Sequence, residues 1–294
     1  MAAKRNRWLV VSVLVVAIGA FLALSLLPLL SGRSPRPGVA STSSTTQTNA
    51  ATELEDRARG YELVLEREPD NETAILGLVE TRIQLGDLQG VVEPLAKLSD
   101  MNPDIPEYRV LLGQTKQALG DSDGAAEAYR NVLTNRPGEM NALQGLVQLL
   151  LAQDRPQAAI GLLQDTLQTA VQTNDLQAGT IDVVSVRLLL GEVYVQQERF
   201  EDAIDAYDEA IAQAAEDFRP LLAKALVLRD LERQGEASSL FAQAEALAPD
   251  QYKDQIRQMA SAGTAASDTE VSPVPTGDAS SGLADEETSE PNAP

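Results

Sequence analysis

Hydrophobic and polar positions divide the 294-residue chain into parts with different physical character. Residues 8–30 are uninterrupted apolar chain, and residues 53–262 alternate apolar and polar positions with the spacing of amphipathic helices. Residues 31–52 and 263–294 contain few large apolar side chains. The pattern predicts a membrane-spanning helix, a flexible linker, a long all-α body and a disordered acidic tail.

Residues 8–30 are long enough to cross a membrane as one helix. These 23 residues rise about 34 Å, which spans a hydrocarbon core of about 30 Å. A cleaved signal peptide is the alternative. The apolar region of a signal peptide is shorter than residues 8–30, however, and its cleavage site lies closer to the end of that region than Gly38 to Ala40 do here. We expect a single-pass membrane protein of a bacterial inner or thylakoid membrane. The basic residues 1–7 and the two arginines after the span leave the side of the body open.

The body repeats every 34 residues. Pro69, Pro103 and Pro137 each follow a helical pattern, and both intervals between them are 34 residues. When each unit is numbered so that this proline is position 32, a turn-forming residue is expected at position 15 between two helices. Asp154 replaces glycine there in the third unit, and in the last unit Gly235 comes three positions late, which predicts an irregular turn. The units begin at Glu72, Pro106, Met140, Val184 and Phe218.

Each unit offers two helices of about 12 to 14 residues, which are marginal alone in water and must be stabilised by packing. Small residues at positions 8 and 20 allow the paired helices to approach closely, and a bulky residue at position 24 fills the gap beside them. An insertion near residues 172–182 lengthens a loop or the adjoining helix ends. We expect about five to six units in residues 53–262, closed by cap helices at residues 52–68 and Asp250–Ala260.

This pattern resembles the tetratricopeptide repeat. The closest match is RLLLGEVYVQQERFEDAIDAYDEAI at residues 187–211, followed by LLGQTKQALGDSDGAAEAYRNVLTNRP at residues 111–137. The resemblance implies a helix-turn-helix solenoid wound into a right-handed superhelix, with a concave groove that binds a partner protein. One unit, LQGLVQLLLAQDRPQAAIGLLQDTL at residues 143–167, resembles cyanobacterial and plastid proteins that support thylakoid biogenesis.

The same resemblance assigns the groove to positions 2, 5, 6, 9, 12 and 13 of each first helix. At those positions this chain is rich in amide and aliphatic residues. From Glu72 onward, Arg219 and Arg229 are the only basic residues at these groove positions. The Lys/Asn/Arg clamp with which some family members bind acidic chaperone tails is missing, so such a ligand is disfavoured. The candidate protein-binding residues are Gln114, Gln117, Asn141, Gln144, Gln148, Glu192 and Gln196.

The stretch LGDSDGAA at residues 119–126 looks like part of a calcium-binding loop but lacks two of its ligands. An EF-hand loop with Gly124 at position 6 needs an acid or amide at position 1 and a glutamate at position 12, where this chain has leucine and arginine. The 34-residue register places the stretch at a turn between two helices. We expect Asp121, Ser122 or Asp123 to cap the second helix, and no metal site.

Composition removes most enzyme chemistries. The chain contains no histidine and no cysteine, which excludes imidazole acid–base catalysis, thiol nucleophiles and His/Cys zinc sites. Its carboxylates show no convergence in the sequence. The net charge is −21, and a body this acidic repels nucleic-acid phosphates. We expect no enzyme activity, no cofactor, no small-molecule substrate and no nucleic-acid partner.

The sequence thus predicts a membrane-tethered adaptor or assembly scaffold for a protein partner, which the resemblance links to thylakoid or photosynthetic-complex biogenesis. Two alternatives stay open within the binding class. One is an inner-membrane protein whose periplasmic repeat domain aids translocation or envelope assembly, and the other is a soluble secreted binding protein after signal cleavage. An enzyme that uses a carboxylate pair is the alternative from another class.

Overall fold

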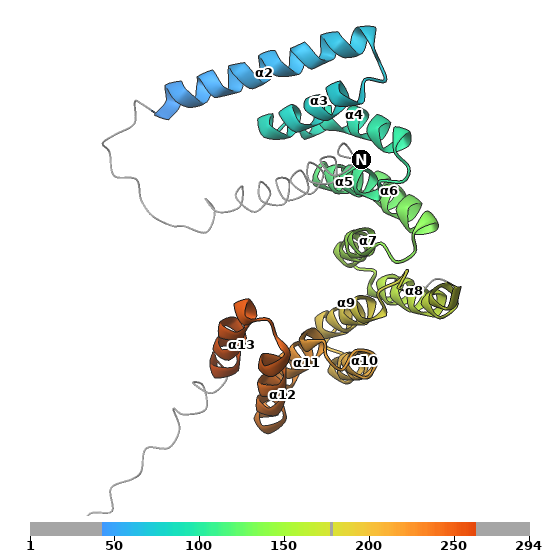
Figure 1. Ribbon diagram of the computed structural model, residues 1–294, viewed down its shortest axis with the longest axis vertical. Coiled ribbons are helices and arrows are strands. Elements are labelled where there is room, and N and C mark those ends of the chain that lie inside the picture. The colour runs from blue at the N-terminus through green and yellow to red at the C-terminus, as the bar shows by residue number, and fades with distance from the viewer. Residues whose placement is uncertain (1–42, 177–178, 263–294) are drawn as a thin grey trace, which may run out of the picture.

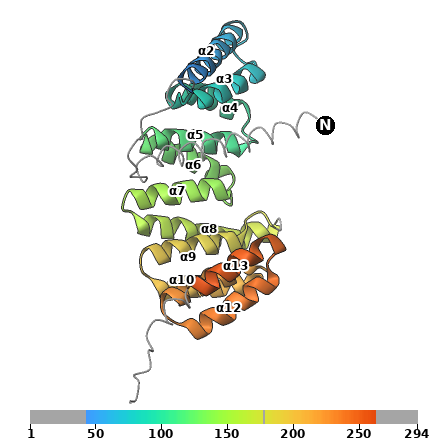
Figure 2. The same cartoon turned by 90° about the vertical axis from the view of Figure 1, so that its left-hand side faces the viewer.

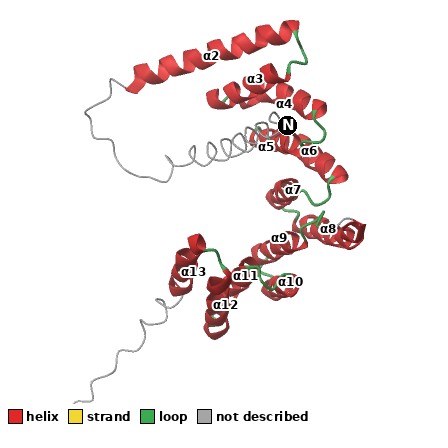
Figure 3. Cartoon of the chain, in the orientation of Figure 1, coloured by secondary structure: helices red, strands yellow, loops and turns green. Residues whose placement is uncertain are grey.

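The computed structural model describes residues 43–176 and 179–262, and every regular element in these ranges is an α-helix (Figure 3). None of these helices is long and apolar enough to cross a membrane. The expected membrane span at residues 8–30 and the expected tail at residues 263–294 lie outside the described residues. The helices are α2 (Ser43–Arg67), α3 (Glu72–Leu85), α4 (Leu88–Met101), α5 (Pro106–Ala118), α6 (Ser122–Asn135), α7 (Met140–Ala152), α8 (Pro156–Leu176), α9 (Val183–Gln196), α10 (Phe200–Gln213), α11 (Phe218–Asp230), α12 (Gln234–Leu247) and α13 (Asp250–Ala262).

The helices form pairs that stack one upon the next (Figure 2). Each helix packs mainly against its neighbours along the chain, as expected when short amphipathic helices bury their apolar faces against adjacent ones. The array curves so that α3, α5, α7, α9 and α11 lie along its inner side and α4, α6, α8 and α10 along its outer side (Figure 1). The all-α helical repeat predicted from the 34-residue period is confirmed.

A tyrosine packed against glycines sets the distance between adjacent helices. Tyr129 of α6 is fully buried, and its ring lies against Gly113 of α5 and Gly145 of α7. A Cβ atom at Gly113 would lie 2.6 Å from Tyr129 Cε1, and one at Gly145 would lie 2.5 Å from Tyr129 Cζ. Only glycine therefore fits at either position while the ring stays in place. The same close contact recurs between Gly191 and Tyr207 and between Gly77 and Tyr61.

All five turns within the units place position 15 in the left-handed region of backbone conformation. Glycine adopts this conformation freely, whereas the Cβ atom of any other residue crowds the following carbonyl group. The fifth turn is therefore regular, and the prediction of an irregular turn at Gly235 is wrong. Gly235 lies inside α12, and Glu232 carries the left-handed φ. The five residues and their φ values are Gly86 (75°), Gly120 (82°), Asp154 (56°), Glu198 (56°) and Glu232 (60°).

The aspartate-rich stretch is a turn followed by a helix cap. The carboxylate of Asp121 accepts a hydrogen bond of 2.9 Å from the backbone N–H of Gly124 at the start of α6. Asp87 makes the same contact with Gly90 at the start of α4. The prediction that Asp121 caps the second helix is confirmed. Within the described ranges, no group of three or more Asp or Glu side chains is placed to hold a metal ion.

The first described helix begins earlier than expected. α2 starts at Ser43, so residues 43–52, which the composition assigned to the flexible linker, are helical in the structure. The second half of α2 packs on α3, where Ala58 is buried and Glu62 pairs with Arg82. Once this half has formed, adding turns toward the N-terminus needs no new nucleation, which offsets the modest helix propensity of Ser and Thr. α2 and α13 close the two ends, as predicted for the cap helices.

The insertion near residues 172–182 lengthens α8 and leaves the stacking of the units intact. α8 has 21 residues, and the chain then returns through a short loop to α9. The side chain of Asn174 closes this loop, since it donates to the carbonyl oxygen of Ile181 and accepts from its N–H, both at 2.9 Å. Ile181 is buried and packs close to Gly138.

The apolar core is divided into three clusters along the array. The first unites α3, α4 and α5, the second and largest runs from α5 to α11, and the third joins α11, α12 and α13. α5 and α11 each contribute buried residues to two clusters. In α5, Leu111 belongs to the first cluster and Val110 to the second; in α11, Val227 belongs to the second cluster and Leu228 to the third. These two helices therefore join neighbouring clusters into one continuous body.

The glycine–tyrosine contact predicts a large response to one methyl group. Gly191→Ala should lower the free energy of unfolding by about 1 to 3 kcal/mol, because the new Cβ atom overlaps with the buried ring of Tyr207. Gly161→Ala is the matched control, since open space surrounds Gly161 in α8, and it should raise stability by up to about 1 kcal/mol through helix propensity. Urea unfolding followed by circular dichroism measures both; equal effects would contradict the assigned packing.

The left-handed turns predict a stabilising substitution. Glu232→Gly should raise the free energy of unfolding by about 1 kcal/mol, because glycine removes the steric penalty of a φ of 60°. The same replacement at the exposed helical residue Glu127 of α6 should lower stability by about 1 kcal/mol. Thermal denaturation of the two variants tests the sign of each change in stability. A destabilised Glu232→Gly chain would show that the left-handed φ of Glu232 is not strained.

Candidate binding face on the first helices

The seven predicted binding residues lie on α5, α7 and α9, along the inner side of the array (Figure 1). We call the side chains at positions 2, 5, 6, 9, 12 and 13 of α3, α5, α7, α9 and α11 the inner face. The structure exposes five of the seven predicted residues, on the adjacent helices α7 and α9. Spacings of three and four residues place those of α7 on one side of the helix. The exposed residues are Asn141, Gln144, Gln148, Glu192 and Gln196.

Gln114 and Gln117 of α5 are half-buried, and they differ in their contacts. The hydroxyl of Tyr129 donates a hydrogen bond of 3.1 Å to Gln117 Oε1. Burial raises the pKa of Tyr129 to about 12, so this hydroxyl keeps its proton at neutral pH. Gln117 thus satisfies a buried tyrosine and has less hydrogen-bonding capacity left for a ligand than Gln114.

Glu192 is exposed on α9, but protein atoms crowd its carboxylate on the concave side of the array. This partial desolvation raises the pKa of Glu192. Burial, and then the charge of Glu192, raise the pKa of the nearby Tyr207. Glu192 forms no ion pair within the described ranges. A cation or hydrogen-bond donor from a ligand would therefore stabilise the partly desolvated carboxylate at this position.

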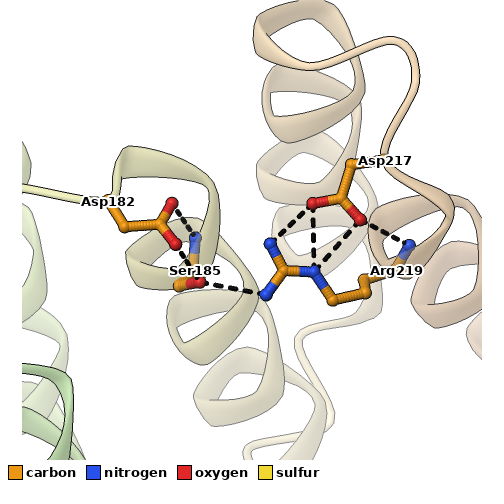
Figure 4. Close-up of polar contacts among 4 residues, drawn as sticks. All are labelled: Asp182, Ser185, Asp217 and Arg219. Atoms are coloured by element: carbon orange, nitrogen blue, oxygen red, sulfur yellow. Dashed lines mark hydrogen bonds and ion pairs between the residues drawn. The ribbon is translucent and has the colours of Figure 1, made fainter. Parts of the chain in front are cut away.

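Arg219, one of the two basic residues at the groove positions, is already paired. Arg219 Nε lies 3.0 Å from both carboxylate oxygens of Asp217, and its Nη2 lies 2.6 Å from Asp217 Oδ2 (Figure 4). Arg219 Nη1 donates to Ser185 Oγ at 3.2 Å, and Ser185 in turn donates to Asp182 Oδ2 at 2.6 Å. Partial burial alone would raise the pKa of Asp217, but the hydrogen bonds and charge of Arg219 lower it. A bidentate pair of this kind holds the guanidinium group in place.

Arg229, the second basic residue of the inner face, is also occupied. Its Nη2 lies 2.9 Å from Asp230 Oδ1, and its Nη1 donates to the carbonyl oxygen of Met259 at 3.2 Å. The inner face therefore offers an acidic peptide only arginines that already bind carboxylates. This geometry agrees with the missing clamp in the sequence.

Sequence reasoning missed the polar contacts that join α9 to α11. Ser185 and Arg219 both occupy position 2 of their units, 34 residues apart, so the repeat period was the available signal. Asp182 and Asp217 cap the same two helices by accepting backbone N–H groups. An aspartate before α9 and before α11, each followed by a polar residue at position 2 of the helix, is the sequence pattern that marks this contact.

Two clefts lie outside the predicted binding residues. The larger, of about 290 Å³, is lined by residues of α2, α3 and α4, including Leu65, Ile75 and Arg82. The smaller, of about 50 Å³, lies where α4, α5 and α6 meet. Neither cleft includes a residue of the predicted set.

Comparison with known proteins identifies the repeat. Residues 110–174 and 188–252 match the family model described as Tetratricopeptide repeat. Protein CTR9 homolog of Arabidopsis thaliana is 28% identical over 135 residues, which are 46% of this chain. The chain spans only 12% of the length of that curated relative. The similarity therefore concerns a small part of that relative, and the activity of the whole relative is not established for this chain.

Two solved structures are similar to part of this chain. Yeast Tom70 is 14% identical with a TM-score of 0.50, over 74% of this chain and 46% of that chain. A thermophilic TPR protein of Thermus thermophilus is 20% identical with a TM-score of 0.42, over 66% of this chain and 99% of that chain. At these identities the likeness to Tom70 concerns the fold alone.

The desolvation of Glu192 predicts a pH-dependent gain in stability on substitution. Glu192→Gln should raise the free energy of unfolding at pH 7, because the glutamine carries no charge to desolvate. A folded-state pKa above the ordinary 4.5 means that the stability associated with Glu192 is present below pH 4.5 and is lost as the pH rises through the folded-state pKa. The difference between variant and wild type should therefore vanish below pH 4.5. Urea unfolding at both pH values measures it, with Glu127→Gln on the outer helix α6 as control.

Proposed function

We propose that this chain is a non-enzymatic scaffold that binds a protein partner along the inner face, because residues 110–174 and 188–252 match the tetratricopeptide-repeat model. Repeats of this kind stack into an extended surface that contacts a ligand over several units. The matched repeats extend from α5 to the start of α13 and so include all seven predicted binding residues.

The exposed amides of α7 carry this proposal. Gln144 and Gln148 form no side-chain hydrogen bond to another described residue, although the buried side of the same helix contributes Leu143 and Leu146 to the core. An amide side chain both donates and accepts hydrogen bonds. Two such groups one turn apart can pair with the polar groups of a polypeptide, which itself presents donors and acceptors along its length.

The charge of the inner face favours a neutral or basic partner segment. Arg219 and Arg229 are held by Asp217 and Asp230, so an acidic segment would have to displace those contacts. The carboxylate of Glu192 is unpaired within the described ranges and partly desolvated. A lysine or arginine of the partner placed against Glu192 would therefore contribute to binding, and would do so more strongly at low ionic strength.

In this proposal residues 8–30 hold the repeat body at a membrane. Their length and lack of charge support the anchor, and the residues that follow them join the anchor to α2. The chain would thereby keep its partner close to the bilayer. The resemblance of residues 143–167 to thylakoid-biogenesis proteins supports a role in the assembly of photosynthetic complexes.

Site-specific photocrosslinking in native membranes tests the binding face. A benzophenone amino acid at Gln148 on α7 should form an adduct with a discrete partner, because that side chain points away from the core. The same amino acid at Asp165, which is exposed on the outer helix α8, should not form that adduct. Adding Gln144→Ala and Glu192→Ala together should reduce the adduct at Gln148 severalfold.

Two outcomes would contradict the proposal. Adducts of equal yield at Gln148 and Asp165 would show that the inner face is not selective, and no adduct at Gln148 would show that it is not occupied. The intact mass of the chain recovered from the same membranes tests the anchor, which requires residues 8–30 to be present. A mature chain that begins after Ala40 would contradict the anchor and leave the binding face unaffected.

A further inference from the structure

Among the described residues, α2 differs from every other second helix in having no first helix of its own unit beside it. In the five later units, positions 20 and 27 of the second helix are buried. The corresponding residues of α2 are Arg57 and Val64, and both are exposed. α2 lies at the end of the stack, with the other described helices on one side only (Figures 1 and 2). The buried pairs of the later units are Val91 and Leu98, Ala125 and Val132, Ala159 and Thr166, Ala203 and Ala210, and Ala237 and Ala244.

The contacts of α2 with α3 use one side of the helix. Ala58 is buried, Tyr61 packs against Gly77, and Leu65 packs against the first core cluster. The residues on the opposite side follow the four- and three-residue spacing of a helix seam. They are Asp56, Gly60, Leu63 and Arg67, and all four are exposed.

This outer seam contains a knob and a gap. Leu63 is 58% exposed, which leaves a large apolar side chain in water. One turn earlier, Gly60 has no atom within 4 Å of the position of a Cβ atom, so the backbone is open to a close approach. A leucine from an adjacent helix can occupy the space beside Gly60.

The charges of the outer seam are complementary to themselves when a second copy of α2 runs antiparallel. In that arrangement Gly60 of one chain faces Leu63 of the second copy, and Asp56 faces Arg67 of the second copy. A two-fold axis makes each contact twice, so the seam contains two leucine–glycine layers flanked by two opposite-charge layers. Arg59, which forms an ion pair with Asp56 of its own chain, and Glu66 lie along one flank, and they also meet with opposite charge across the interface in this register. Parallel pairing would instead bring Asp56 against Asp56 and Arg67 against Arg67.

We propose that the outer seam of α2 is a homodimer interface in which two copies of this chain pair antiparallel across a two-fold axis. The interface leaves the inner face of both copies open, because it uses the side of α2 that faces away from α3. A dimer therefore presents two inner faces from one assembly. The affinity falls with added salt, since half of the seam layers are exposed ion pairs.

Charge exchange tests this register in the full chain. The dissociation constant of the dimer is measured by sedimentation equilibrium in detergent. Arg67→Glu and Asp56→Arg should each raise that constant at least about tenfold, because a two-fold axis converts one substitution into two repulsive contacts. The double variant carrying both substitutions should recover the wild-type constant within about threefold, since the opposite charges face each other again. Glu55→Arg, an exposed charge of α2 outside the seam, is the matched control and should leave the constant unchanged.

Disulfide crosslinking gives an independent readout of direction. The chain has no cysteine, so each introduced thiol is unique. A mixture of Gly60→Cys and Leu63→Cys chains should crosslink to each other faster than either chain crosslinks to itself. Circular dichroism checks that each variant keeps its helix content.

Four results would overturn the proposal. A wild-type chain that stays monomeric at high concentration would mean that α2 is covered by another segment of its own chain or by another protein. A dimer that resists both single substitutions would place the interface elsewhere. A double variant weaker than either single variant, or faster crosslinking between identical Gly60→Cys chains, would exclude the antiparallel register.

Discussion

The fit between position 8 of each first helix and position 24 of the paired second helix determines the spacing of the whole array. Where position 24 is tyrosine, position 8 is glycine, as in Gly113 with Tyr129 and Gly191 with Tyr207. Where position 24 is leucine, position 8 is valine, and the last unit pairs Ala225 with Phe241. All of these residues are buried. The two departures from the small residue at position 8, Val79 and Val147, are therefore compensated by the smaller Leu95 and Leu163, so that the summed volume stays similar.

The sequence predicts the fold well because the 34-residue period and the packing of the helices require the same residue types at the same positions. Prolines at 34-residue intervals, small residues at position 8 and acidic caps such as Asp121 are local features with a direct structural meaning. The prediction for the fifth turn is wrong because glycine is a preference there and not a requirement. Glu232 adopts the left-handed conformation when the two helices it joins are fixed by their own packing. The start of α2 differs from the prediction because the composition of residues 43–52 carries no information on the packed half that follows.

The candidate binding face is less predictable than the fold because exposure and pairing depend on neighbouring helices. The sequence identifies the amides of α5 and α7 but cannot show that Gln117 is used by Tyr129 or that Arg219 is held by Asp217 and Ser185. These contacts cross between helices. These contacts determine which polar groups remain able to bind a partner. On the inner face, the remaining groups are mainly amides and one desolvated carboxylate.

The division of the core into three clusters has a mechanical consequence. Each cluster is stabilised by contacts between adjacent helices, and α5 and α11 are the only helices that contribute buried residues to two clusters within the described part of the chain. A force applied between α2 and α13 therefore passes through the three clusters in series, by way of α5 and α11, and is not resisted by one shared core. The array should lengthen stepwise under load, with the small third cluster opening before the large central one, so that stretching changes the curvature of the binding face before the repeat unfolds.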